Sequence, residues 1–109
     1  MKHIERLPQP IVDVLERAAT HFFVTIPEML GKERTASVTR ARRFAAFVLR
    51  GAPYRRSYPE LGRIFNQADH TSAMYGCRVV ERLVAAGDAC ALEALAAIRG
   101  VTEVRDAAE

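Results

Sequence analysis

The sequence predicts an all-α fold, a single domain of about six helices that contains a helix-turn-helix. Apolar residues recur at spacings of three and four in several segments, which is the pattern of amphipathic helices. Two of these segments, 57–65 and 69–86, are separated by a three-residue turn. At 109 residues and 50% hydrophobic, the chain has enough apolar material for one core. We expect the domain to cover 10–99, after an irregular lead-in at 1–9 and before an acidic tail at 100–109.

The first two helices are predicted from apolar spacing and from capping residues. One helix should run from about Pro10 to Phe23, with helical spacing in its apolar positions. These positions are Ile11, Val14, Leu15, Ala18 and Phe22. Thr25 has the form of an N-cap with a proline close behind it, so a short second helix should follow and end at Gly31.

Basic charge is concentrated in residues 31–56. This window holds eight basic residues and one acidic residue, a formal charge of +7, whereas the whole chain carries +3. The loop from Lys32 to Arg34 is too short and too charged to be buried. Such a block is often only a solvated face, but beside a helix-turn-helix it indicates a surface that binds phosphates.

A long basic helix is predicted from Ser37 to Gly51. Its apolar stripe consists of Val38, Ala41, Phe44, Ala45 and Val48. Four arginines lie away from this stripe, namely Arg40, Arg42, Arg43 and Arg50. Phe47 stands among these arginines on the outward face, so it needs cover from the last helix to be buried.

The helix-turn-helix is predicted after the breaker-rich connection Gly51 to Arg56. Ser57 followed by Glu60 forms a capping box, and Asp69 offers a second N-cap after the turn. The first helix has an apolar face of Tyr58, Leu61, Ile64 and Phe65. The second has a stripe of Ala73, Cys77, Val80 and Val84 and should end at Gly87.

The start of the second helix of such a motif enters the major groove, so its first polar residues reach base edges. Here these residues are His70, Thr71 and Ser72. The opposite side from the apolar stripe is polar and basic, with Thr71, Tyr75, Arg78 and Arg82. The simpler interpretation is that Asp69 and Ser72 only cap the helix and that the others are ordinary solvated residues.

The remaining features argue against other classes of function. A last helix should run from the N-cap Asp88 to about Arg99 and stop at Gly100, with Leu92, Leu95 and Ile98 facing inward. Cys77 and Cys90 have no partners at metal-ligand spacing, so we expect reduced core residues and neither metal nor cofactor. No nucleophile with an oriented base is evident, which predicts a non-enzyme. No run approaches the ~18 apolar residues of a membrane span, so a cytoplasmic protein without membrane partners is expected.

The segments 57–65 and 69–72 resemble a known signature. They read SYPELGRIF and DHTS, and they are similar to the DNA-binding domain of the bacterial replication initiator DnaA, which has Ser-Leu-Pro-Glu-Ile-Gly and Asp-His-Thr-Thr there. Residues 27–32 resemble the segment that leads into that family's basic loop, and 37–50 resemble its basic helix. The resemblance covers roughly residues 10–99.

The resemblance implies a set of residues that contact double-stranded DNA. Asp69, His70, Thr71 and Ser72 are implied to read bases, and Arg34 matches a basic side chain that enters the minor groove. The remaining implied contacts, mostly to the DNA backbone, are Arg42, Arg43, Arg50 and Pro59. Arg42 and Arg50 match basic positions of the family, whereas Arg43 replaces a residue that is often polar.

The sequence departs from the family at the turn. Asn66-Gln67-Ala68 stands where the family has two glycines and an arginine, and the connection before Ser57 is one residue longer. No Gly-x-x-x-x-Gly-Lys-Ser/Thr motif occurs, so we expect that the chain cannot initiate replication by itself.

Three functions remain open on the sequence. The first is recognition of sites like the DnaA box that modulates replication initiation. The second is a protein-binding adaptor that acts on the initiator or its regulatory ATPase, and the third is a transcriptional regulator. No dimerisation element is obvious, so a monomer is expected.

Overall fold

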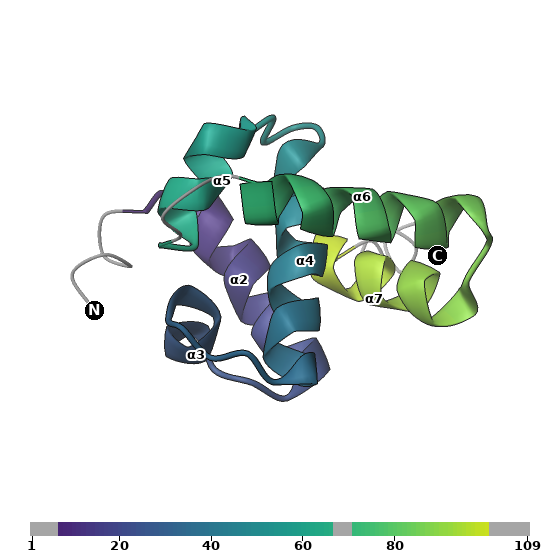
Figure 1. The fold of residues 1–109 in the computed structure, drawn as a ribbon, viewed down its shortest axis with the longest axis horizontal. Coiled ribbons are helices and arrows are strands. Elements are labelled where there is room, and N and C mark those ends of the chain that lie inside the picture. The colour runs from purple at the N-terminus through teal and green to yellow at the C-terminus, as the bar shows by residue number, and fades with distance from the viewer. Residues whose placement is uncertain (1–6, 67–70, 101–109) are drawn as a thin grey trace, which may run out of the picture.

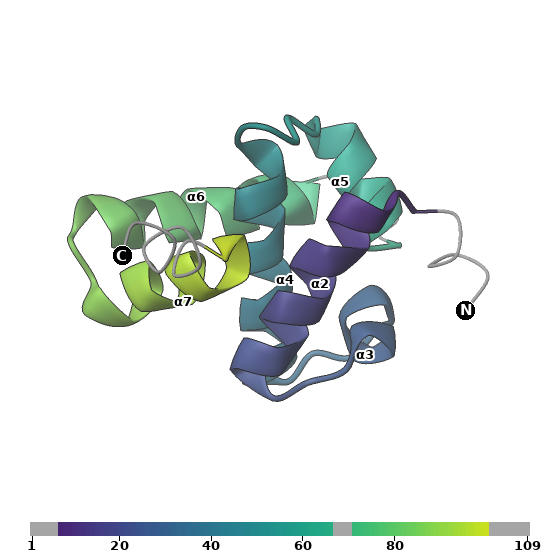
Figure 2. The same ribbon diagram turned by 180° about the vertical axis from the view of Figure 1, so that it is seen from behind.

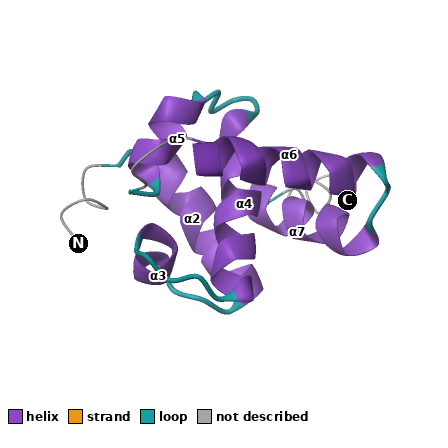
Figure 3. Cartoon of the chain, in the orientation of Figure 1, coloured by secondary structure: helices purple, strands orange, loops and turns teal. Residues whose placement is uncertain are grey.

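The computed structural model describes residues 7–66 and 71–100, and within them every regular element is a helix (Figure 3). The elements are α2 (Gln9–Phe22), α3 (Ile26–Leu30), α4 (Ala36–Arg50), α5 (Tyr58–Ile64), α6 (Thr71–Ala85) and α7 (Ala89–Arg99). This confirms the all-α fold with six helices. The order agrees with the prediction, and the helix ends that lie within the described residues differ from the predicted ones by one or two residues.

Capping boxes begin the two short helices. At α3 the backbone amide of Thr25 donates to Glu28 Oε1 at 2.8 Å, and the Thr25 hydroxyl accepts from the Glu28 amide. At α5 the same pair of bonds joins Ser57 and Glu60, with 2.7 Å from the Ser57 amide to Oε1. Each box satisfies two amides that a helix start leaves without partners.

The last helix begins and ends as its sequence predicts. The Asp88 carboxylate accepts from a backbone amide in the first turn of α7, and Gly100 follows the helix in the left-handed conformation. Gly87 also has a positive φ, 73°, at the end of α6. Asp69 and His70 lie outside the described residues, so the predicted N-cap of α6 is not tested.

Helix α4 lies at the centre of the molecule. Helix α6 crosses one of its faces, and α2 lies against the other, as the two opposite views show (Figures 1 and 2). Helices α3, α5 and α7 also contact α4. Its buried positions are therefore more numerous than the predicted stripe, and they include Ala46 and Leu49 as well. A helix with neighbours on most sides buries most of its circumference.

The prediction for α7 was wrong at Leu92, which is 46% exposed. The inward-facing residues are Ala91, Ala94, Leu95 and Ile98. Successive side chains point about 100° apart around a helix. The buried face through Leu95 therefore includes Ala91, the residue before Leu92, rather than Leu92 itself. Phe47, for which the sequence offered cover only from the last helix, is half-buried, and the Arg99 guanidinium of α7 lies 6.0 Å from the centroid of its ring.

The two cysteines differ in their surroundings. Cys77 is buried against the core, and this burial raises the pKa of its thiol to about 11. Cys90 is exposed in the first turn of α7, which corrects the expectation that both cysteines are core residues. Cys90 is exposed because the buried face of α7 begins one residue later, at Ala91.

Candidate nucleic-acid interface

A groove of about 830 Å³ lies between the loop that follows α3, the side of α4 and the start of α6. We call it the basic groove and define it by Lys32, Arg34, Arg42, Arg43, Ser72 and Tyr75, with Glu33, Thr39 and Asn66 also in its lining. The fold thus brings together four of the predicted site residues from three separate elements. Four cations against one carboxylate make the groove a favourable place for an anion.

Arg43 enters the groove because α6 has a glycine where the two helices cross. Gly76 is buried, and a Cβ built on it would lie 2.7 Å from Cγ of Arg43. The Arg43 side chain therefore occupies the space that a larger residue at this position would fill. The Arg43 guanidinium extends toward Tyr75, and its Cζ lies 5.3 Å from the centroid of the Tyr75 ring. This cation–π contact directs the positive charge along the groove.

Arg42 lies on the same side of the groove, but its guanidinium is engaged with the backbone. Nε donates to the carbonyl of Met29 at 2.6 Å, and Nη2 donates to the carbonyls of Glu28 and Gly31 at 3.1 and 2.8 Å. These three carbonyls belong to the last turn and the C-cap of α3. Sequence reasoning placed Arg42 on the flank of α4 and could not find these partners.

Arg34 is exposed in the loop between α3 and α4. The loop begins at Gly31, whose carbonyl accepts from Arg42, and it ends at Thr35. The Thr35 hydroxyl accepts from the amide of Val38 at 3.4 Å and so caps α4. Arg34 is thus held between two anchored ends while its side chain faces solvent.

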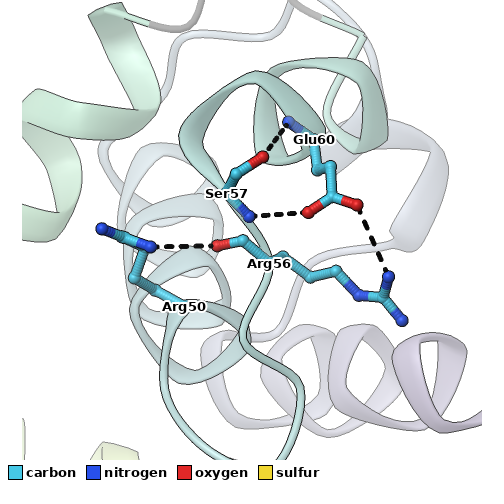
Figure 4. A network of polar contacts seen from close by, with 4 residues as sticks. All are labelled: Arg50, Arg56, Ser57 and Glu60. Atoms are coloured by element: carbon cyan, nitrogen blue, oxygen red, sulfur yellow. Dashed lines mark hydrogen bonds and ion pairs between the residues drawn. The ribbon is translucent and has the colours of Figure 1, made fainter.

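Arg50 and Pro59 form a second part of the predicted site. Arg50 lies at the C-terminal end of α4, with Cζ 4.1 Å from the centroid of the Tyr58 ring, and its Nη1 donates to the Arg56 carbonyl (Figure 4). Pro59 is exposed in the first turn of α5. Neither residue lines the basic groove, so the structure divides the predicted backbone contacts between two places.

Of the four residues predicted to read bases, Asp69 and His70 lie outside the described residues. Thr71 and Ser72 are exposed at the start of α6, and Ser72 lines the basic groove. Tyr75 lies one turn after Thr71 and is 56% exposed. The sequence placed Tyr75 on the polar face of this helix but gave no reason to select it, because its partner Arg43 is 32 positions away.

Other kinds of site have no support in the described part of the chain. No group of three His, Cys, Asp or Glu residues there could hold a metal ion. None of the helices described is long and apolar enough to cross a membrane.

The fold and the basic groove together define a helix-turn-helix domain. Helices α5 and α6 are the two helices of the motif, and a cationic groove flanks the second. Comparison with known families agrees, since the model described as the bacterial dnaA protein helix-turn-helix matches residues 11–80. The chain belongs to this family, and the resemblance seen in the sequence is thereby confirmed.

Individual proteins that are similar to this chain are also named DnaA. The chromosomal replication initiator protein DnaA of Xanthobacter autotrophicus is 36% identical over 74% of this chain. The proteins of that name from Rhodopseudomonas palustris and Cereibacter sphaeroides are 36% and 33% identical, each over 69% of the chain. The match covers only 16% of the length of each of these relatives.

Proposed function

We propose that the chain binds double-stranded DNA at sites related to the DnaA box and thereby modulates the initiation of replication. The observation that carries the proposal is the basic groove, in which Arg34, Arg43 and Ser72 come together from a loop and two helices. The membership of the chain in the DnaA helix-turn-helix family supports the same conclusion.

The arrangement suits one strand of a duplex. If the start of α6 lies in the major groove of DNA, the sugar-phosphate strand beside it runs along the basic groove. Arg43 is then directed at phosphates, and Arg34 lies beyond that strand, where the adjacent minor groove begins. Arginine favours narrow minor grooves, which are typical of A·T-rich sequence.

Each predicted residue has a place in this proposal. Asp69, His70, Thr71 and Ser72 contribute base contacts from the start of the reading helix, and Arg34 contributes the minor-groove contact. Arg43, Arg50 and Pro59 lie along the DNA backbone, and Arg42 lies beside them with its guanidinium bound to the carbonyls of α3. Of these, Arg43 is the best placed for a phosphate, because Tyr75 and Gly76 hold its side chain in the groove.

The test of the proposal is fluorescence anisotropy with two labelled duplexes, one carrying a DnaA box and one with the same bases scrambled. At about 0.15 M salt, weak electrostatic attraction is largely screened. We expect binding to the box to be tighter by ~100-fold or more. Equal and weak binding to both duplexes would contradict sequence-specific recognition and would favour a protein-binding adaptor.

Two substitutions separate base contacts from phosphate contacts. Thr71→Ala should cost about 1–3 kcal/mol on the box and reduce the preference over the scrambled duplex. Arg43→Ala should weaken binding to both duplexes and reduce the slope of log K against log salt by about one. Arg40→Ala, an exposed arginine of α4 outside the groove lining, is the matched control and should change neither. Identical behaviour of the Thr71 and Arg43 variants would contradict this division of roles.

A further inference from the structure

We propose that Arg42 is a positioning residue that fixes the loop presenting Arg34, and that it affects DNA affinity through that loop. This inference rests on the proposed function for its effect on DNA, but its structural part is independent of DNA. It gives Arg42 a role different from that of its neighbour Arg43, although both are arginines on one side of α4.

The first argument is the number and kind of hydrogen bonds. Two nitrogens of Arg42 donate to three carbonyls, those of Glu28, Met29 and Gly31. The carbonyls at the end of a helix lack the next turn of amides and carry the negative end of the helix dipole. A guanidinium can serve several of them at once because its donors form a rigid planar fork.

The second argument is that α3 has little stability of its own. It is a single turn of five residues, far below the length at which an isolated helix is stable. Its start is fixed by the capping box at Thr25, and its end is fixed from α4 by Arg42. Loss of the Arg42 bonds would remove the partner of the Gly31 carbonyl, and Gly31 would keep only the bond from its amide to the Glu28 carbonyl at 3.3 Å.

The third argument is the surroundings of the guanidinium. Its burial lowers the pKa of Arg42, and the positive charge of nearby Arg34 lowers it further, whereas Glu33 raises it. The two guanidiniums therefore lie close enough to repel each other. The carbonyls of α3 offset this repulsion at Arg42, so that Arg34 can be held beside it with its side chain in solvent.

Charge-preserving substitution tests the inference. Arg42→Lys keeps the cation but cannot reproduce a fork that serves three carbonyls. We expect Arg42→Lys and Arg34→Ala each to weaken binding to the box duplex by about tenfold. In the Arg34→Ala background, Arg42→Lys should change the affinity by less than about twofold, because the minor-groove contact that the loop presents has then been removed. If the losses of affinity caused by Arg42→Lys and Arg34→Ala multiply in the double variant, Arg42 contacts DNA itself and the inference is overturned.

A second readout needs no DNA. In Arg42→Lys, the backbone amides of Met29 and Gly31, which donate to the Thr25 and Glu28 carbonyls, should exchange with solvent at least about tenfold faster than in the natural chain, whereas amides of α6 should be unaffected. Arg40→Lys is the matched control and should leave exchange and affinity unchanged. Unchanged exchange in the Arg42 variant would overturn the inference even if DNA binds. Faster exchange in a chain without preference for the box would retain the role of Arg42 and reject the proposed function.

Discussion

At Gly76 the surface of α6 has no side chain, and the stem of Arg43 from α4 fills that space. The absence of a Cβ thus serves a packing purpose, because Gly76 lies inside a regular helix. Glycine in a helix interior costs about 1 kcal/mol relative to alanine. Here that cost accompanies the placement of a cation in the basic groove.

Gly76→Ala therefore has two opposed effects. The gain in helix propensity is about 1 kcal/mol, and the clash with Arg43 Cγ should cost about 1–3 kcal/mol. We expect a net loss of up to about 2 kcal/mol in the free energy of unfolding, measured by urea denaturation, together with weaker binding to both duplexes.

The control for this prediction is the same substitution after the clash has been removed. In an Arg43→Ala background, the nearest remaining atoms are Cβ and Cα of residue 43, at 3.5 and 3.6 Å from the built Cβ, which are ordinary contacts. Gly76→Ala should then stabilise the domain by about 1 kcal/mol. Destabilisation in both backgrounds would show that Arg43 is not the cause.

At the scale of the elements, the capping boxes of α3 and α5 show what sequence alone can predict. The Ser57 box and the N-caps at Thr25 and Asp88 were predicted, whereas the N-cap at Thr35 and the complete box at Thr25 were not, although all of them join residues three positions apart. Local spacing therefore contains the information for helix starts. In α5, Arg56 adds an ion pair to Glu60 at 3.7 Å (Figure 4).

The box of α5 predicts a dependence of stability on pH. Hydrogen bonds from the backbone and side chain of Ser57, followed by the charges of Arg56 and Arg63, lower the pKa of Glu60 below its ordinary value of 4.5. The charged carboxylate therefore favours the folded state above pH 4.5, and this contribution is lost as the pH falls through the lowered value. Glu60→Gln keeps an oxygen for the box but has no charge to lose.

The measurement is the urea midpoint of the natural chain and of Glu60→Gln between about pH 6 and pH 3. The natural chain should be the more stable at the upper end, and the difference should shrink as Glu60 becomes protonated. Other carboxylates titrate in both chains, so only this difference reports Glu60. A difference that stays constant with pH would contradict the prediction.

At the scale of the whole molecule, the stability of the fold depends on α4, which every other helix contacts. Leu49 of α4 is fully buried, whereas Leu92 of α7 is nearly half exposed. Leu49→Ala should lower the free energy of unfolding by about 2–5 kcal/mol, and Leu92→Ala should change it by no more than about 0.5 kcal/mol. Urea denaturation of the two variants checks this, and equal effects would show that the core is placed incorrectly.

These two leucines also mark the limit of sequence analysis. Spacing predicted both the helices and most of their buried stripes, because periodicity follows from the geometry of a single helix. Leu49 was missed and Leu92 was wrongly included, since the number of neighbours around each helix is set by the whole fold. The basic groove has the same origin. Its arginines were predicted from charge and family resemblance, whereas the carbonyl partners of Arg42 and the stacking of Arg43 on Tyr75 depend on how helices cross.

The crossing with α4 at Gly76 divides α6 into two parts of unequal length. About 7 Å of helix lies between this point and Thr71, and about 14 Å lies between it and Ala85. If α6 rotates as a rigid body about this crossing, a displacement at the end joined to α7 moves Thr71 in the opposite direction by roughly half as much. Under the proposed function, a change in the α6–α7 hairpin should therefore alter the orientation of the helix start that is proposed to read bases.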